Sequence, residues 1–179
     1  AAVPVVISFP ITPPEITTDS LPDGTYATSY TKTLGATGGT GTYNTWTIAA
    51  GALPPGVTLN TSTGVLSGTP TKAGVYTVSF TVTDSNTKTS ATRSYTVAIG
   101  KLPVTVAASS HTVPYGSTTP AVTPSYATLV GSDTTTTLNT APNGAPACST
   151  TYTSSTPVSL SPVDTVCSGG WAENYTFQS

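Results

Sequence analysis

The chain has 179 residues, of which only 7% are charged, and its formal net charge at pH 7 is −2. So few and so balanced charges provide no basic surface for nucleic acid, and no apolar run is long enough to span a lipid bilayer. Thr and Ser fill most polar positions, and Gly and Pro number 16 each. Because Thr is β-branched and turn residues are dense, this composition predicts an all-β protein of two small domains.

Residues 1–14 are predicted to form an apolar strand followed by a Pro-rich linker. The side chains that share one face of the strand are Val3, Val5, Ile7 and Phe9. Pro4 cannot donate a ladder hydrogen bond, so one side of the strand must be an edge there. Pro13 and Pro14 stiffen the exit. The strand has no obvious hairpin partner in the sequence.

Residues 15–100 have the pattern of a β-sandwich. Strands are expected over Tyr26–Leu34, Tyr43–Ile48, Val75–Thr83 and Thr89–Ile99, separated by Gly- and Pro-containing turns. The clearest alternation places Tyr76, Val78, Phe80 and Val82 on one face and threonines or serine on the other. Trp46 is the large residue expected to anchor the core.

Five short segments in this domain carry a family resemblance. In order they are Leu21–Thr25 (LPDGT), Gly38–Gly41 (GGTG), Leu53–Val57 (LPPGV), Gly64–Pro70 (GVLSGTP) and Gly74–Tyr76 (GVY). Together they resemble the putative-Ig, cadherin-like repeat of large bacterial surface proteins. The resemblance implies an immunoglobulin-like sandwich that serves as an extracellular spacer or adhesive module, and it implies no catalysis.

Residues 101–179 are predicted to form a second immunoglobulin-like domain. Val104 and Val106 alternate in its first strand, Tyr115-Gly116 follows, and Asn174-Tyr175 lies near its end. This pattern resembles the mostly-bacterial Ig-like (MBG-type) family. Members of that family continue into one further apolar strand, so the resemblance implies a domain that lacks its last strand.

The two cysteines, Cys148 and Cys167, both lie in the second domain. An isolated pair in a Ser/Thr-rich context predicts a structural disulfide formed outside the cytosol, with two free thiols as the alternative. By the chain-entropy model, closing this loop stabilises the fold by about 3 kcal/mol. Ala1-Ala2 is a sequence that a signal peptidase could leave, which also favours an extracellular or cell-surface location.

The residues that carry chemistry are few and scattered. His111 is the only histidine, and the acidic residues stand singly in turns, so no acid, base and nucleophile constellation is present and no enzymatic activity is expected. The best metal candidates are Asp84, Asp19 and Asp23, which could bind Ca²⁺, the one cofactor considered. The alternative is that each aspartate closes its own turn. Asn60 and Asn174 begin glycosylation sequons.

Three functions remain open from the sequence. The favoured one is a subunit of a cell-surface filament or adhesive fibre, in which Val3–Phe9 pairs with the incomplete C-terminal domain of a neighbouring copy. The second is a spacer or carbohydrate-binding module, with Tyr43, Trp46 or Trp171 stacking on surface glycans; Trp46 is the expected core residue, so Trp171 is the best surface aromatic of the three. The third is an ancillary domain of a secreted enzyme.

Overall fold

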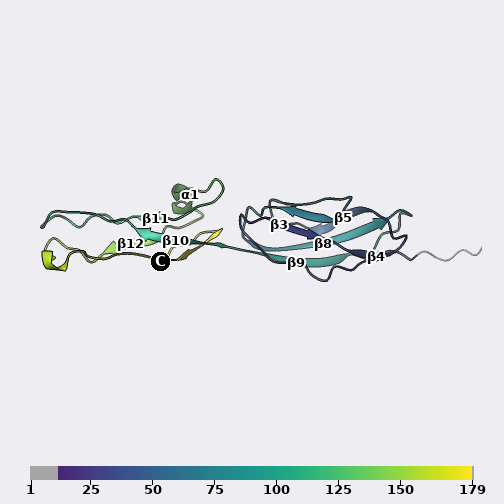
Figure 1. Cartoon of the computed structure of the whole chain (residues 1–179), viewed down its shortest axis with the longest axis horizontal. Helices are drawn as coiled ribbons and strands as arrows, with labels where there is room; N and C mark the ends of the chain where they lie inside the picture. Colours follow the sequence, from purple (N-terminus) through teal and green to yellow (C-terminus); the bar gives the residue numbers. More distant parts are fainter. Residues whose placement is uncertain (1–11, 179) are drawn as a thin grey trace, which may run out of the picture. The chain divides into compact units, whose positions relative to one another are not determined.

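The computed structural model describes residues 12–178, which form two compact units that divide between Gly100 and Lys101. We call them unit 1 and unit 2 and describe each by itself (Figure 1). Almost all regular structure in residues 12–178 is β-strand, which confirms the predicted all-β class. The predicted strand with Val3, Val5, Ile7 and Phe9 lies outside the described residues. No helix of residues 12–178 is long and apolar enough to cross a membrane.

Unit 1 is a two-layered β-sandwich with a small additional strand pair. Its larger sheet has the order β2–β9–β8–β5, formed by Gly24–Thr25, Arg93–Gly100, Gly74–Asp84 and Tyr43–Gly51. Its smaller sheet has the order β3–β7–β6, formed by Tyr30–Thr33, Val65–Gly68 and Val57–Leu59. β1 (Pro14–Ile16) pairs with β4 (Ala36–Gly38). All pairings are antiparallel except that of β2 with β9, which is parallel.

The core of unit 1 follows from the alternation along β8. Val78, Phe80 and Val82 are completely buried, as the sequence pattern predicts, and Leu66 of the smaller sheet is also completely buried. Trp46 is 3% exposed, which confirms it as a core residue. Apolar side chains from the two sheets therefore remove each other from water, which is the main stabilisation of such a fold.

Gly64 is required by the way Trp46 packs. It adopts a φ of +70°, and a Cβ at this position would lie 2.7 Å from Cε2 of the Trp46 ring. The backbone N–H of Trp46 also donates to the carbonyl of Thr61, at 2.7 Å. The turn between β6 and β7 thus covers the indole, and this fits only a residue without a side chain.

Three predicted strands in unit 1 have wrong boundaries, and the one expected to end at Ile48 continues to Gly51. The strand expected over Tyr26–Leu34 is interrupted, because β2 ends at Thr25 and β3 begins only at Tyr30. Ala27 adopts a left-handed φ of 57°, and its N–H donates to the carbonyl of Pro70 at 2.9 Å. A turn that crosses between sheets therefore replaces the middle of the expected strand. The strand expected from Thr89 begins at Arg93.

Unit 2 contains two small sheets. β10 (Leu102–Ala108) lies between β11 (Pro124–Tyr126), with which it is antiparallel, and β14 (Tyr175–Gln178), with which it is parallel. β12 (Ala147–Thr150) and β13 (Thr165–Ser168) form an antiparallel pair. The buried apolar side chains of unit 2 are Val104, Val106, Leu138, Cys167, Ala172 and Tyr175.

Two short helical turns complete unit 2. α1 (Thr135–Asn139) is capped by Thr134, whose hydroxyl accepts from the Thr137 N–H at 3.2 Å while the Thr137 hydroxyl accepts from the Thr134 N–H at 2.9 Å. This capping box stabilises a helix too short to form alone, and it places Leu138 in the core. The 3₁₀ turn η1 spans Val158–Leu160.

Candidate functional site

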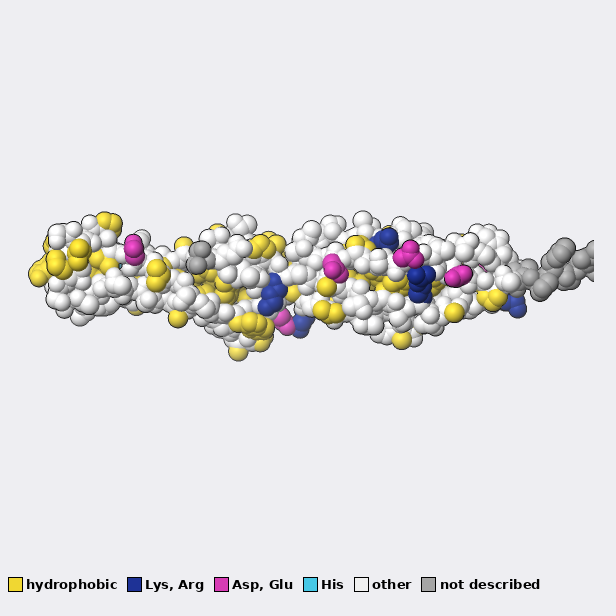
Figure 2. Space-filling view, turned by 90° about the horizontal axis from the view of Figure 1, so that it is seen from below, with side chains coloured by type: hydrophobic (Ala, Val, Ile, Leu, Met, Phe, Trp, Pro, Cys, Tyr) yellow, Lys and Arg dark blue, Asp and Glu magenta, His cyan; other side chains and the backbone are white. Residues whose placement is uncertain are grey.

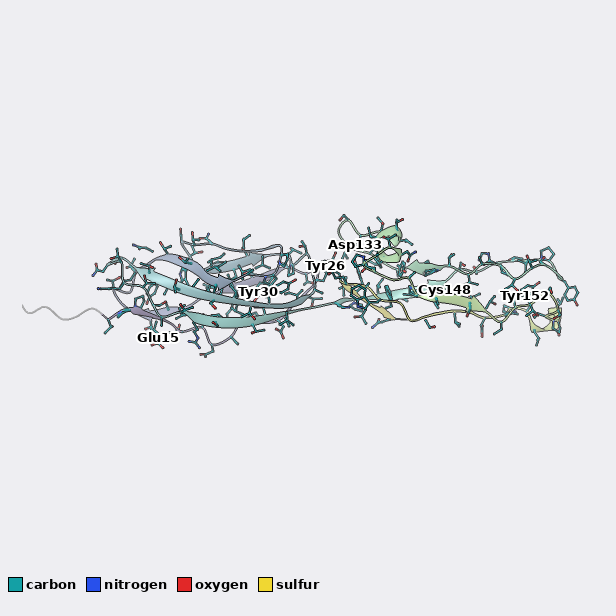
Figure 3. All side chains as sticks on the ribbon, turned by 180° about the vertical axis from the view of Figure 1, so that it is seen from behind. Glu15, Tyr26, Tyr30, Asp133, Cys148 and Tyr152 are labelled. Carbon is teal, nitrogen blue, oxygen red and sulfur yellow. A yellow bond between two sulfur atoms is a disulfide. The ribbon has the colours of Figure 1, made fainter. Side chains whose placement is uncertain are left out.

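The disulfide fixes one wall of the candidate site. Cys148 and Cys167 lie directly opposite each other in the β12–β13 pair and are joined by a disulfide, which confirms the prediction (Figure 3). Cys167 is 8% exposed and faces the core, and Cys148 is half-buried. A hairpin of two four-residue strands makes few ladder bonds, so the covalent bond is a large part of what holds these strands together.

The second wall is the sheet formed by β10 and β14. The N–H of Leu102 donates to the carbonyl of Asn174 at 2.8 Å, which starts the parallel ladder. β14 is the last strand in this sheet order, and no strand of residues 12–178 continues the sheet beyond it. The ring of Phe177 lies 5.5 Å from the ring of Tyr126, centroid to centroid. Phe177 is only half-buried by this packing.

A groove lies between these two walls, and we call it the β14 groove. Its volume is about 130 Å³, and its lining residues are Val106, Pro146, Cys167, Ser168, Gly169, Phe177 and Gln178. Gly170, beside the groove, has a φ of +82°, and a Cβ there would lie 2.7 Å from the backbone nitrogen of Pro146. Apolar side chains of Val106, Pro146 and Phe177 line part of this gap between the two sheets of unit 2. Such a gap can accept apolar side chains from another segment. Of the described residues that line it, none is His, Asp, Glu, Lys or Arg.

Asp84, the centre of the expected Ca²⁺ site, is 1% exposed and satisfied by backbone groups. Its Oδ1 accepts from the N–H groups of Asn86 and Lys88 at 2.9 and 2.8 Å, and its Oδ2 accepts from the N–H of Thr40 at 3.1 Å. The carboxylate therefore closes the turn after β8 and joins it to the loop after β4. This geometry corresponds to the turn-closing alternative.

Asp19 and Asp23 bind different partners in unit 1. The Asp19 carboxylate pairs with the Arg93 guanidinium at 3.2 Å, and the Asp23 carboxylate accepts from the N–H of Ala98 at 2.9 Å. Within residues 12–178, no three His, Cys, Asp or Glu side chains gather closely enough to hold a metal ion. The structure thus does not bring the three predicted aspartates together as a ligand set, and Ca²⁺ binding stays a prediction.

The two sequons occupy different environments. Asn60 is exposed in the turn after β6, and its Oδ1 accepts from the N–H groups of Ser62 and Thr63 at 3.0 and 3.1 Å. Asn174 is half-buried immediately before β14. Asn60 is therefore the more accessible of the two, and glycosylation at either position stays a prediction.

The predicted sugar-stacking aromatics are not equivalent. Trp46 is buried. Tyr43 is half-buried, and the Tyr43 hydroxyl donates to the carbonyl of Gly38 at 3.3 Å. Trp171 is 50% exposed, and the Lys101 ammonium lies 5.0 Å from its ring centroid. The expectation that Trp171 is a surface aromatic is therefore confirmed, but a cation already faces its ring.

Sequence reasoning missed the walls of the β14 groove. The Asn174-Tyr175 motif marks the end of the domain in the sequence, but nothing in the sequence shows that Phe177 and Val106 line the same gap. The parallel pairing of β14 with β10 creates that proximity, and it joins segments more than 70 residues apart. The available signal was the alternation of apolar and polar residues within each strand. It shows which side chains share a face of a strand, but not which strands pair with each other.

Comparison with known proteins gives one family and several partial structural likenesses. The sequence profile of the Putative Ig domain family matches residues 7–100. No curated protein matches the chain. Among solved structures, a putative alpha-galactosidase from Bacteroides fragilis has a TM-score of 0.43 at 20% identity, covering 55% of this chain and 22% of that one.

Two cadherin structures give similar partial likenesses. Drosophila N-cadherin EC1-4 has a TM-score of 0.38 at 15% identity, covering 52% of this chain and 27% of that one. The protocadherin GammaB4 extracellular domain has a TM-score of 0.40 at 18% identity, covering 65% of this chain and 24% of that one. The chain thus spans about a quarter or less of the length of these proteins, and likenesses at this level bear on neither activity nor partners.

Proposed function

Because the chain belongs to the Putative Ig domain family, we propose that it is a non-enzymatic extracellular structural protein, a subunit of a cell-surface filament or adhesive fibre. Copies assemble head-to-tail: the segment Val3–Phe9 of one copy enters the β14 groove of the next and pairs along β14. In this proposal unit 2 is an MBG-type domain, and the segment Val3–Phe9 of the neighbouring copy adds a strand to it.

The observation that carries the proposal is the open side of unit 2. Phe177 is half-buried beside a groove lined by Val106 and Pro146, and no strand of residues 12–178 follows β14 in its sheet. A sheet edge next to unfilled apolar space favours the addition of a strand, whose main chain pairs with the edge and whose alternate side chains enter the gap.

The apolar segment near the N-terminus has the complementary pattern. Val3, Val5, Ile7 and Phe9 share one face of an extended segment, and Ala2, Pro4, Val6 and Ser8 occupy the alternate positions. Fully burying a side chain of this kind contributes about 1.5–3 kcal/mol before ordering entropy is subtracted. Because donor and acceptor are different surfaces, the contact does not close into a dimer and propagates as a filament.

The remaining features support an extracellular location. The Cys148–Cys167 disulfide persists in oxidising compartments, and the family is an immunoglobulin-like one. The partners are copies of the same chain, with surface glycans or other surface proteins as further partners. No catalytic role and no required cofactor is proposed.

The proposal is tested by refolding the full chain at high concentration and imaging the product by electron microscopy. We expect fibres from the wild type and monomers from the Ile7→Asp/Phe9→Asp variant, because two charges cannot enter an apolar groove. The matched control is Ala2→Asp/Ser8→Asp, which adds the same charge on the opposite face and leaves fibres intact.

A complementation experiment identifies the acceptor. The Phe177→Asp variant is also expected to stay monomeric, because its groove carries a charge. Mixed with the Ile7→Asp/Phe9→Asp variant, it supplies the intact donor segment to an intact groove, so the mixture forms heterodimers without fibres. Fibres that persist in either variant, or a wild type that stays monomeric, would contradict donor-strand assembly.

A further inference from the structure

Two long loops of unit 2 form a surface distinct from the β14 groove. Residues 109–123 connect β10 to β11, and residues 151–164 connect β12 to β13. The hydroxyl of Thr119 donates to the carbonyl of Tyr152 at 3.2 Å, and the Tyr152 hydroxyl approaches the carbonyls of Pro114 and Ser117 at 3.4 and 3.3 Å. Tyr152 thus fastens one loop to the other (Figure 3).

The two loops enclose a pocket of about 340 Å³, which we call the loop pocket. This volume lies at the lower end of the range of roughly 300–1,000 Å³ that is typical of small-ligand sites. Its walls include apolar side chains of Val113, Pro120 and Val158 and hydroxyl groups of Ser110 and Thr112. Figure 2 shows hydrophobic side chains gathered on the surface at the end of unit 2 (left in the view).

The composition of the loop pocket selects a neutral ligand. Of the described residues that line it, none is Asp, Glu, Lys or Arg. A phosphorylated or otherwise anionic ligand would find no cation to offset its desolvation, and a cationic ligand would find no carboxylate. A metal ion would find no group of acidic or His/Cys ligands.

Its polar and aromatic groups fit a sugar. Tyr115 is 68% exposed and stands at the wall of the pocket, where its ring can pack against the C–H face of a pyranose. His111 is held by a 2.9 Å contact between its Nε2 and the hydroxyl of Ser109, and it lines the pocket beside the hydroxyl groups of Ser110 and Thr112. Such hydroxyls both donate and accept, as sugar hydroxyls require.

We propose that the loop pocket of unit 2 binds a neutral oligosaccharide, with Tyr115 as the stacking residue and His111 with the surrounding Ser and Thr hydroxyls as hydrogen-bonding partners. A purely apolar peptide fits less well, because it would leave several of these hydroxyls in the pocket without a partner. The proposal stands on the loops alone and does not depend on assembly through the β14 groove.

The test is titration of the full-length Ile7→Asp/Phe9→Asp variant with neutral tetrasaccharides of α-linked glucose, β-linked glucose and β-linked mannose. Binding is measured by calorimetry and by the shifts of NMR amide signals. We expect at least one tetrasaccharide to bind and to shift amides within residues 109–123 and 151–164. Tyr115→Ala is expected to weaken binding at least about tenfold, as loss of one stacked aromatic does.

The matched control is Tyr76→Ala, which removes a half-buried tyrosine from unit 1 and is expected to leave the affinity unchanged. Circular dichroism of both variants establishes that the fold is retained. If no tetrasaccharide binds, or if Tyr76→Ala and not Tyr115→Ala weakens binding, the loop pocket is not the sugar site. Neither result would bear on fibre formation, which is measured separately.

Discussion

Unit 1 and unit 2 are both built of β-strands, but they bury their apolar side chains by different means. In unit 1, large residues from facing sheets, among them Trp46, Leu66 and Phe80, are at most 3% exposed. In unit 2 the buried side chains are mostly smaller, such as Val104 and Ala172, and a disulfide crosses one of the two sheets. Small domains with little core commonly depend on such a covalent bond. Unit 1 is therefore held by packing, and unit 2 by packing, a disulfide and, as we propose, its neighbour.

The largest expected effect is the loss of a core ring in unit 1. Phe80→Ala removes a completely buried side chain that packs 5.9 Å from the ring of Tyr95, so we expect unit 1 to lose about 4 kcal/mol of unfolding free energy. Denaturant unfolding with amide NMR signals from each unit measures this. Val75→Ala on the same strand is the control, because Val75 is 72% exposed. Equal losses for both variants would mean that unit 1 does not depend on its core.

The second-largest expected effect is a loss of stability in unit 2 that leaves unit 1 unchanged. Reducing the Cys148–Cys167 bond is expected to destabilise unit 2 by about 3 kcal/mol, since the unfolded chain regains the freedom of the closed loop. Unit 1 contains no cysteine and should keep its transition. Scanning calorimetry with and without reductant measures both, and the Cys148→Ser/Cys167→Ser variant should match the reduced wild type. A shift of the unit 1 transition would show that the units do not unfold independently.

A smaller loss is expected from Asp84→Asn in unit 1. The side-chain amide keeps one oxygen that can accept from the N–H groups of Asn86 and Lys88, but it places an NH2 group where Oδ2 now accepts from the N–H of Thr40. One mismatched buried bond of this kind costs about 2 kcal/mol. Thermal unfolding with and without Ca²⁺ measures this loss and tests the metal alternative. A Ca²⁺-induced rise of the unit 1 transition that Asp84→Asn abolishes would show that Asp84 is a metal ligand.

The smallest effect concerns alkaline pH. Burial raises the pKa of Tyr95 above its ordinary value; the nearby Arg93 lowers this pKa and Asp19 raises it further. Burial, and after it the charge of Asp23, raises the pKa of Tyr30. A raised folded-state pKa means that stability is fully present below the unfolded-state value of about 10 and falls as pH rises through the folded-state value. Unit 1 should therefore weaken only above about pH 10. Thermal unfolding from pH 8 to 11.5 measures this, and a decline that begins below about pH 9 would contradict it.

The two units also differ in how well the sequence predicts them. Alternation identified β8 and its buried residues, and the isolated cysteine pair in a Ser/Thr-rich context identified the disulfide. The break after Thr25 was missed, because the left-handed Ala27 is stabilised by the carbonyl of Pro70, which is distant in sequence. The helix α1 was missed because the three threonines and the asparagine among its five residues have low helix propensity. Its capping box and the burial of Leu138 stabilise it.

The candidate site was predictable only in part. The sequence provided the apolar segment Val3–Phe9 and the Asn174-Tyr175 motif, but neither the β14 groove nor the loop pocket. Each is formed by side chains from segments that meet only through tertiary pairing, as Val106 and Phe177 do across the β10–β14 ladder. The aspartates show the opposite case, because the residues that the sequence suggested as metal ligands are each used by backbone N–H groups or by Arg93.

The most direct test of the central claim is a photo-crosslink from the β14 groove. Phe177 is replaced by the photoreactive p-benzoylphenylalanine, a mixture of ¹⁵N-labelled and unlabelled chains is refolded and irradiated, and the crosslinked peptides are identified by mass spectrometry. The account predicts crosslinks between labelled and unlabelled chains that join position 177 to a peptide containing Val3–Phe9. Crosslinks confined within one chain, or directed to any other segment of the neighbour, would contradict it.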